Sequence, residues 1–192
     1  MRAFRGSLVT HSTIHSAMSQ SVFRNISGVW KYLFTTAWYS IIMTKLDPVR
    51  LDDELESILS RGGVGLMQSV VEHLRRRYPK YAWVGIYMLE GGTLVLRAWS
   101  GSRPTEHTRI PVGVGICGLA ARTAETVIVD DVSKDPRYLA CFPETKSEIV
   151  VPIIRDGKVL GEIDIDGEEI GAFNSADRAF LEALANRLSR MV

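Results

Sequence analysis

Apolar residues recur with the period of an α-helix in three parts of the chain. The segment 67–74 is apolar at i, i+3, i+4 and i+7, which predicts an amphipathic helix that ends before Pro79. A shorter acidic helix is predicted over 51–59. The apolar positions of 181–188 have helical spacing and follow a capping residue at 174 or 175, so a final helix is predicted there.

Other segments have the short length and the composition of β-strands. Turn residues join two pairs of them, Gly91-Gly92 in the first pair and Asp156-Gly157 in the second, so two hairpins are predicted. The predicted strands are 81–89 and 93–99, then 127–129, then 148–155 and 158–166.

Less regular segments separate these elements. We expect a polar loop over 100–107, then a brief Ala-rich helix over 117–123 that is entered at Gly115. Residues 130–145 are predicted to form a long irregular loop, and such loops inside compact domains are usually functional or disordered. The order of helices and hairpins predicts an α+β fold, in which helices pack on a central antiparallel sheet.

Residues 1–46 differ from the rest of the chain because they contain basic residues but no Asp or Glu. Their aromatic segment 29–43 is shorter than the about 20 apolar residues of a membrane-spanning helix. Three interpretations stay open: a translation start assigned too early, with Met43 as the true start, a targeting segment, or a membrane-associated segment. We expect an N-terminal extension over 1–46 and one domain over 47–192.

The composition excludes some classes of protein. A formal net charge of +1 gives no electrostatic reason to expect nucleic acid as a partner. Two cysteines are too few for a disulfide-stapled secreted scaffold, and no Cys/His cluster has the spacing of a zinc site. A reducing compartment is therefore expected, and with it a cytoplasmic location and thiols that stay free to react.

Both cysteines lie where a thiol can react, although a free cysteine is often only a small buried hydrophobe. Cys141 lies in the polar, proline-containing loop, where it can act as a nucleophile if its pKa is lowered. Cys117 is predicted at a helix start, where free backbone N–H groups and the helix dipole favour a thiolate or a bound anion.

Three acids form a second candidate group. Asp164 and Asp166 are two positions apart on a strand and therefore share one face of the sheet, and Glu148 begins the partner strand of the same hairpin. The alternation is also compatible with a plain amphipathic strand whose acidic face is solvated. If the carboxylates converge, their repulsion requires a cation among them, either a ligand ammonium or a metal ion.

Two aromatic residues and a glycine-rich run complete the candidates. Trp83 and Tyr87 share one strand face, where they are either core residues or an aromatic wall for a small ligand. The glycines at 113, 115 and 118 match the spacing of a dinucleotide-binding fingerprint, but no parallel βαβ unit surrounds them, so we reject that motif.

Four blocks of sequence, in this order, resemble the GAF-domain free methionine-(R)-sulfoxide reductases. They are Arg-Ile-Pro-Val-Gly-Val-Gly-Ile-Cys-Gly at 109–118, Leu-Ala-Cys at 139–141, Ser-Glu-Ile-Val-Val-Pro at 147–152 and Ile-Asp-Ile-Asp at 163–166. The likeness extends over residues 81–192. It implies a GAF-like fold with an enclosed pocket, and an enzyme of methionine repair under oxidative stress.

The resemblance also implies residue roles. Cys141 is the expected nucleophile, which takes the sulfoxide oxygen as a sulfenic acid; a second thiol then forms a disulfide that a thioredoxin-like reductant opens. Glu148, Asp164 and Asp166 are expected to bind the substrate ammonium and polarise the sulfoxide. The substrate carboxylate is expected at backbone amides near Ile116 and Cys117. Trp83 and Tyr87 match the pocket aromatics.

At two places this sequence differs from the family pattern, and both differences bear on the catalytic cycle. His107 occupies the position at which many members carry a resolving cysteine, so resolution passes to Cys117 or to an external thiol. Phe142 and Pro143 replace the small polar residues common after the nucleophile. No cofactor or metal ion is expected, and a homodimer is compatible with the sequence. The alternative function is a non-catalytic GAF sensor or interaction domain that binds a small molecule.

Overall fold

The computed structural model describes residues 49–192 of the chain. The extension predicted over 1–46, with its three interpretations, lies outside these residues, and the domain boundary at 47 stays a prediction. Within residues 49–192, no helix has both the length and the apolar character needed to cross a membrane.

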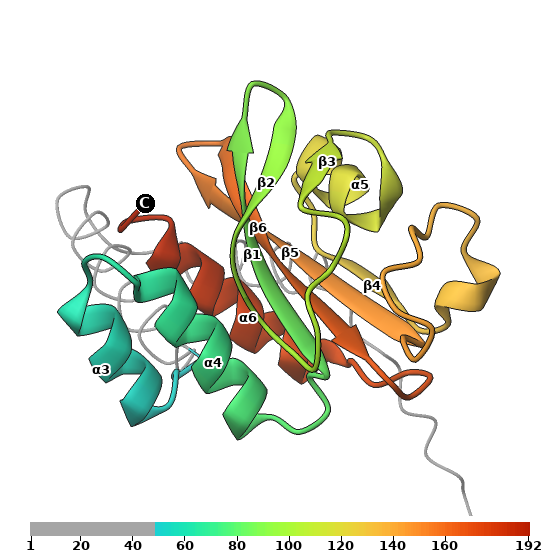
Figure 1. Ribbon diagram of the computed structural model, residues 1–192. Helices are drawn as coiled ribbons and strands as arrows, with labels where there is room; N and C mark the ends of the chain where they lie inside the picture. Colours follow the sequence, from blue (N-terminus) through green and yellow to red (C-terminus); the bar gives the residue numbers. More distant parts are fainter. Residues whose placement is uncertain (1–48) are drawn as a thin grey trace, which may run out of the picture. The chain divides into compact units, whose positions relative to one another are not determined.

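A six-stranded sheet forms the centre of the domain (Figure 1). The strands are β1 (Trp83–Glu90), β2 (Thr93–Ser100), β3 (Arg109–Pro111), β4 (Val127–Val129), β5 (Ser147–Arg155) and β6 (Lys158–Gly167). Their order across the sheet is β3-β2-β1-β6-β5-β4, and every neighbouring pair is antiparallel. The predicted α+β class with an antiparallel sheet is confirmed.

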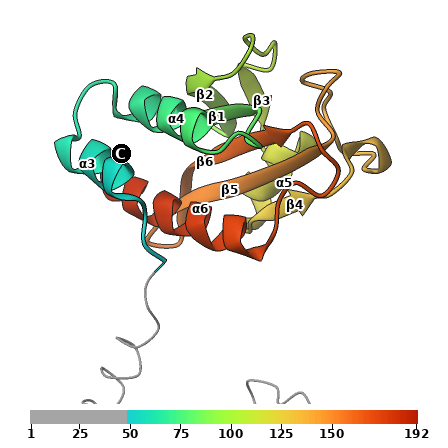
Figure 2. The same ribbon diagram turned by 90° about the horizontal axis from the view of Figure 1, so that it is seen from below.

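Helices cover both faces of this sheet, but unequally. The helices are α3 (Asp53–Arg61), α4 (Leu66–Arg77), α5 (Gly115–Thr123) and α6 (Ser175–Leu188). Helices α4 and α6 pack on one face with α3 beside α4, and α5 alone lies over the other face (Figures 1 and 2). The loop between β4 and β5, which includes the short 3₁₀ helix η1 (Val132–Lys134), extends along the α5 side.

The alternation of strand residues assigns each side chain to one of two buried clusters. On β6, Ile163 and Ile165 pack with the leucines of α4 and α6 in the larger cluster. The residues between them on the strand point to the α5 side, where the smaller cluster contains Trp83, Tyr87 and Cys117. One face of the sheet therefore supplies the main hydrophobic core, which leaves the other face available for a site.

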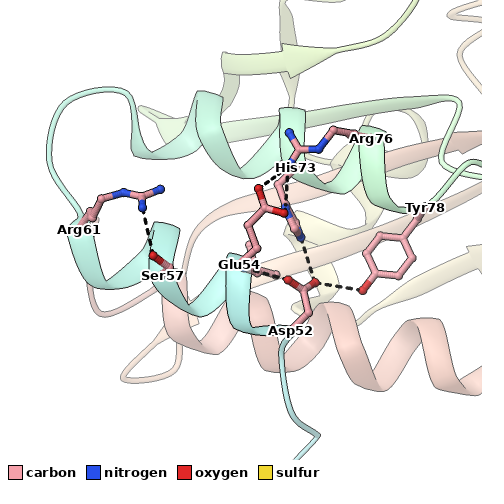
Figure 3. A network of polar contacts seen from close by, with 8 residues as sticks. Asp52, Glu54, Ser57, Arg61, His73, Arg76 and Tyr78 are labelled. Carbon is pink, nitrogen blue, oxygen red and sulfur yellow. Dashed lines mark hydrogen bonds and ion pairs between the residues drawn. The ribbon is translucent and has the colours of Figure 1, made fainter.

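A buried histidine fastens α3 to α4 (Figure 3). The Asp52 side chain caps α3 by accepting the backbone N–H of Leu55, and its second oxygen lies 2.9 Å from Nε2 of His73 on α4. His73 is only 1% exposed, and Glu54 approaches its other ring nitrogen at 3.4 Å. This cluster holds the two helices together on the face opposite α5.

The structure confirms most predicted elements and corrects two. Both hairpins turn at the predicted glycines, and Asn174 caps α6 in a reciprocal capping box. The segment before α5 was predicted only as glycine-rich, but its first residues form the edge strand β3. Helix α5 begins at Gly115 and not at Cys117 because Val114 already has the extended backbone of a cap residue. This segment ends in Pro111 and runs into glycines, so it lacks the apolar run that identified the equally short strand over 127–129.

Candidate active site

Four carboxyl side chains lie on the face of β5 and β6 that α5 covers. Their exposed fractions are 5% for Glu148, 0% for Glu162, and 2% each for Asp164 and Asp166. Glu148 lies directly opposite Asp166 in the hairpin register, so the convergence predicted for the three expected acids is correct. The solvated-strand interpretation is wrong because these acids are buried.

These buried acids have few compensating contacts. Both carboxyl oxygens of Glu162 have no hydrogen-bond partner among the described residues, and neither does one oxygen of Asp164 or one of Asp166. Burial raises the pKa of all four groups, because a low-dielectric environment disfavours the charged form; it raises that of Asp164 to about 7. Buried polar groups without partners are uncommon in folded proteins and mark a place where a ligand can supply the missing contacts.

The N-terminus of α5 faces the same region. Its cap residue, Val114, has no side chain that can accept the first backbone N–H groups of the helix. Ile116 and Cys117 follow in the first turn and are both buried. A Cβ atom at position 118 would lie 2.6 Å from the carbonyl oxygen of Pro111, so the third glycine of the run is required for close backbone packing. Such an uncapped helix start favours an anion.

Cys117 lies between the helix and the acids. Its thiol points to Oε1 of Glu148 at 3.9 Å, and its Sγ lies within 4.8 Å of a carboxylate oxygen from each of Glu148 and Asp164. Burial raises the pKa of this thiol, and the charges of Asp164 and Glu162 raise it further. The predicted thiolate at the helix start is therefore wrong for the ligand-free protein, because burial beside carboxylates outweighs the helix dipole.

Cys141 is held over the acids by a loop that is fixed at several points. Leu139 packs against Gly115 of α5, and a ring nitrogen of His107 lies 3.3 Å from the carbonyl oxygen of Ala140. Arg103 adds a cation–π contact at 5.4 Å over the ring of Phe142 and an ion pair with the next acidic residue of the loop. The segments 101–107 and 139–144 thus close together above the sheet.

The Cys141 thiol is half-buried, whereas Cys117 is buried. Burial raises the pKa of the Cys141 thiol, and the carboxylates of Asp164, Asp166 and Glu148 raise it further. The sequence predicts that Cys141 acts as a nucleophile if its pKa is lowered. In the ligand-free protein the pKa of this thiol is raised instead. A cation bound among these acids would offset their charges and so lower the pKa of the Cys141 thiol.

The two aromatic residues of β1 line the floor of the site. Trp83 stacks on Trp99 with ring centroids 6.4 Å apart, and Phe142 of the loop lies tilted at 5.8 Å from it. The hydroxyl of Tyr87 donates a hydrogen bond to the carbonyl oxygen of His107 at 3.0 Å. Tyr87 therefore presents its ring and not a free hydroxyl, while the indole N–H of Trp83 is buried and has no hydrogen-bond partner within residues 49–192.

The structure brings every predicted site residue to one face of the sheet. Cys117 lies on α5 and Cys141 in the loop, and both face the acids of β5 and β6. Two surface grooves, of about 650 and 620 Å³, lie elsewhere, one along α6 and one along 128–137.

Sequence reasoning missed one member of this group. Glu162 belongs to the same alternation as Asp164 and Asp166 and lies opposite Tyr87 and Pro152 on the neighbouring strands. Extending the two-residue period by one step toward the N-terminus of β6 is the signal that would have identified it. The site therefore contains four acids and not three.

Comparison with known proteins places this geometry in a family. Residues 65–192 match the family model of the GAF domain. The free methionine-R-sulfoxide reductase of Saccharomyces cerevisiae is 47% identical over 112 residues, which cover 56% of this chain and 61% of the yeast protein. The chain thus spans less than two thirds of that relative's length.

Solved structures give the same result over most of their length. The structure of a type II free methionine-R-sulfoxide reductase from Thermoplasma acidophilum is similar with a TM-score of 0.64 and 42% identity, covering 72% of this chain and 94% of that one. The free methionine-R-sulfoxide reductase of Neisseria meningitidis, in complex with its substrate, has a TM-score of 0.66 and 32% identity, covering 74% and 92%.

Proposed function

The chain belongs to the GAF-domain family of free methionine-R-sulfoxide reductases, and we propose that it reduces free L-methionine-(R)-sulfoxide to L-methionine with thiols as the reductant. The GAF-like fold implied by the sequence motifs is confirmed. The observation that carries the proposal is the set of buried acids, three of which have carboxyl oxygens without a hydrogen-bond partner among residues 49–192. They lie between an uncapped helix start and a half-buried thiol.

A free amino acid carries the two charged groups that this site can bind, an ammonium group for the acids and a carboxylate for the helix start. Its ammonium group would lie among Glu148, Asp164 and Asp166, where it supplies the missing countercharge. Its carboxylate would accept the backbone N–H groups near Ile116 at the start of α5. The apolar arm of the substrate would rest on the ring of the buried aromatic pair from β1.

The proposed chemistry is an oxygen transfer to Cys141. Its sulfur attacks the sulfoxide sulfur, the S–O bond of the substrate breaks, and the oxygen and a proton leave with Cys141 as a sulfenic acid while methionine departs. One of these three carboxyl groups, kept protonated by burial, can donate a hydrogen bond to the sulfoxide oxygen as negative charge develops there, while the other two face the ammonium. The substrate ammonium favours the attacking thiolate by offsetting the remaining carboxylates.

Regeneration of the thiol needs a second sulfur. With His107 in place of a resolving cysteine, we assign this step to Cys117 or to an external thiol, followed by a thioredoxin-like reductant. A cytoplasmic location belongs to the same proposal, because free reactive thiols persist only in a reducing compartment. A homodimer is compatible with this chemistry, which needs residues of one chain only.

The proposal is tested by incubating the full chain with racemic free methionine sulfoxide and dithiothreitol and following both epimers on a chiral column. We expect the R epimer to be consumed, methionine to appear in equal amount and the S epimer to remain. N-acetylmethionine sulfoxide, which lacks the ammonium group, should react at least about 100-fold more slowly. Binding of the R epimer without any methionine would instead favour the non-catalytic sensor.

A further inference from the structure

Two glycines lie against the indole ring of Trp83. A Cβ atom at position 85 would lie 2.5 Å from Cη2 and from Cζ3 of the ring, and one at position 101 would lie 2.2 Å from Cδ1. Neither glycine has a positive φ, so the backbone at both positions is open to other residues. Glycine weakens a strand relative to alanine and often marks a place that another group approaches closely. The ring of Trp83 is the group that requires these two glycines.

The glycines determine how the indole lies on the sheet. Its six-membered ring covers Gly85 on β1, and its pyrrole ring covers Gly101, which directly follows β2. Trp99 stacks beside it, with the two ring planes 10° apart. Carbon atoms that are not bonded to each other pack about 3.5–4.0 Å apart. A methyl group at either glycine would therefore push the ring by about 1 Å or more away from the sheet and into the site.

The ring of Trp83 lies between the groups proposed to bind and to attack the substrate. Trp83 pairs with Asp166 across β1 and β6, and Asp166 pairs with Glu148 across β6 and β5. Phe142, the residue after Cys141, has its ring centroid 5.8 Å from that of Trp83. A substrate with its ammonium among the acids and its sulfur at the thiol therefore places its S-alkyl group over the indole. Trp83 is only 3% exposed, which leaves little free space around the ring.

We infer that Gly85 and Gly101 are positioning residues for Trp83 that limit the size of the S-alkyl group in the substrate. The inference rests on the proposed function and adds a selectivity to it, for S-methyl over longer S-alkyl sulfoxides of free amino acids. Because the glycines have no side chain, the indole lies low enough for a methyl group to fit above it. Each atom added beneath the ring removes space above it.

The test compares the R sulfoxides of L-methionine and of L-ethionine, its S-ethyl homologue, with dithiothreitol as the reductant. The quantity measured is the selectivity ratio, kcat/KM for the ethyl substrate divided by kcat/KM for the methyl substrate. Gly85→Ala and Gly101→Ala should each lower this ratio by about tenfold or more, since one methylene group in an apolar pocket changes kcat/KM by about 10–200-fold. Ser102→Ala, next to Gly101 and exposed, is the matched control and should leave the ratio unchanged.

Double variants with Trp83→Phe separate an effect through the ring from a general loss of packing. Phenylalanine lacks the atoms Cη2 and Cζ3 that cover Gly85, but it keeps a ring carbon close to the position of Cδ1. Trp83→Phe alone should therefore raise the selectivity ratio. In the Gly85→Ala background it should restore the ratio to within about threefold of the wild-type value, whereas in the Gly101→Ala background it should not restore it.

Two outcomes would overturn the inference: a selectivity ratio that neither glycine substitution changes, or equal restoration of both variants by Trp83→Phe. Calorimetric binding of L-methionine and L-ethionine, which do not react, gives the same comparison without turnover. A wild-type chain that binds L-methionine but forms none from the sulfoxide would contradict the proposed function, while the binding ratios of the variants would still test the role of the glycines. If Gly85→Ala does not fold, the opposite shifts expected for Gly101→Ala and Trp83→Phe keep the test decisive.

Discussion

Methionine formation by the Cys141→Ser variant is expected to fall by about 1,000-fold or more relative to the wild type. Serine keeps the size of the side chain but is a far weaker nucleophile toward sulfur and cannot hold the oxygen as a sulfenic acid. Cys141 is half-buried in its loop. The loop is held by contacts to the backbone of Ala140 and between the side chains of neighbouring residues, and these contacts do not involve the sulfur of Cys141. The fold should therefore be preserved.

Substrate binding gives the control for this variant. The groups proposed to bind the amino acid lie on β5, β6 and α5 and are unchanged. Cys141→Ser should therefore bind L-methionine, the unreactive product, in a calorimetric titration with an affinity within about threefold of that of the reduced wild type. Near-UV circular dichroism checks the packing of the aromatic floor. Retention of a tenth or more of the wild-type rate in a correctly folded variant would rule out Cys141 as the nucleophile.

The Asp164→Asn variant should be much less active but more stable than the wild type at neutral and alkaline pH. The loss of one carboxylate from the ammonium site should reduce kcat/KM by about 100-fold, as expected when a charge-assisted hydrogen bond in a buried site is removed. The same change replaces a buried carboxyl group, whose ionisation burial disfavours, by a neutral amide of the same size. Activity and stability are therefore expected to change in opposite directions.

The pH dependence of stability has a defined sign. The pKa of Asp164 rises from 3.8 to about 7 on folding because burial disfavours the carboxylate. The folded protein thus holds a proton that the unfolded chain releases, so the stabilising contribution is complete below about pH 4 and is lost as the pH rises through about 7. Glu148, Glu162 and Asp166, whose pKa values are also raised, act in the same direction.

Urea denaturation at two pH values measures this effect. At pH 8 the free energy of unfolding of Asp164→Asn should exceed that of the wild type by roughly 2–4 kcal/mol, and at pH 4 the difference should be small. Glu168→Gln, which alters an exposed carboxylate next to β6, should change neither stability nor kcat/KM. An Asp164→Asn protein that is less stable than the wild type at pH 8, or fully active, would contradict this account of the acids.

Local sequence patterns predicted most of the fold because each element has its own strong signal. The glycines of the two hairpin turns, the capping box at Asn174 and the leucine spacing of α6 are all short-range features. The edge strand β3 was missed because its three residues, unlike the apolar run of β4, have no strand pattern, and its pairing with β2 is not visible in the local sequence. Similarly, the His73–Asp52 contact joins residues 21 positions apart and has no local pattern.

The residues that cluster on this face of the sheet were predicted apart from Glu162, but the pKa shifts of the two thiols were not. Residue type and strand alternation identified Cys141, Glu148 and the Asp164–Asp166 pair. The state of a thiol depends on which charges surround it after folding, and these come from different strands and a loop. Burial therefore raises the pKa of the Cys117 thiol, although a thiolate was expected there. Glu162, which the sequence did not single out, is a buried acid for the same reason.

The central claim, oxygen transfer from the free sulfoxide to Cys141, is tested most directly by a single turnover without reductant. The full chain is mixed with excess free L-methionine-(R)-sulfoxide and dimedone, and methionine and cysteine modification are quantified together. We expect one methionine per chain, with the dimedone adduct on Cys141 or a Cys117–Cys141 disulfide in the matching amount. Methionine formed while both thiols stay reduced, or no methionine at all, would contradict the claim.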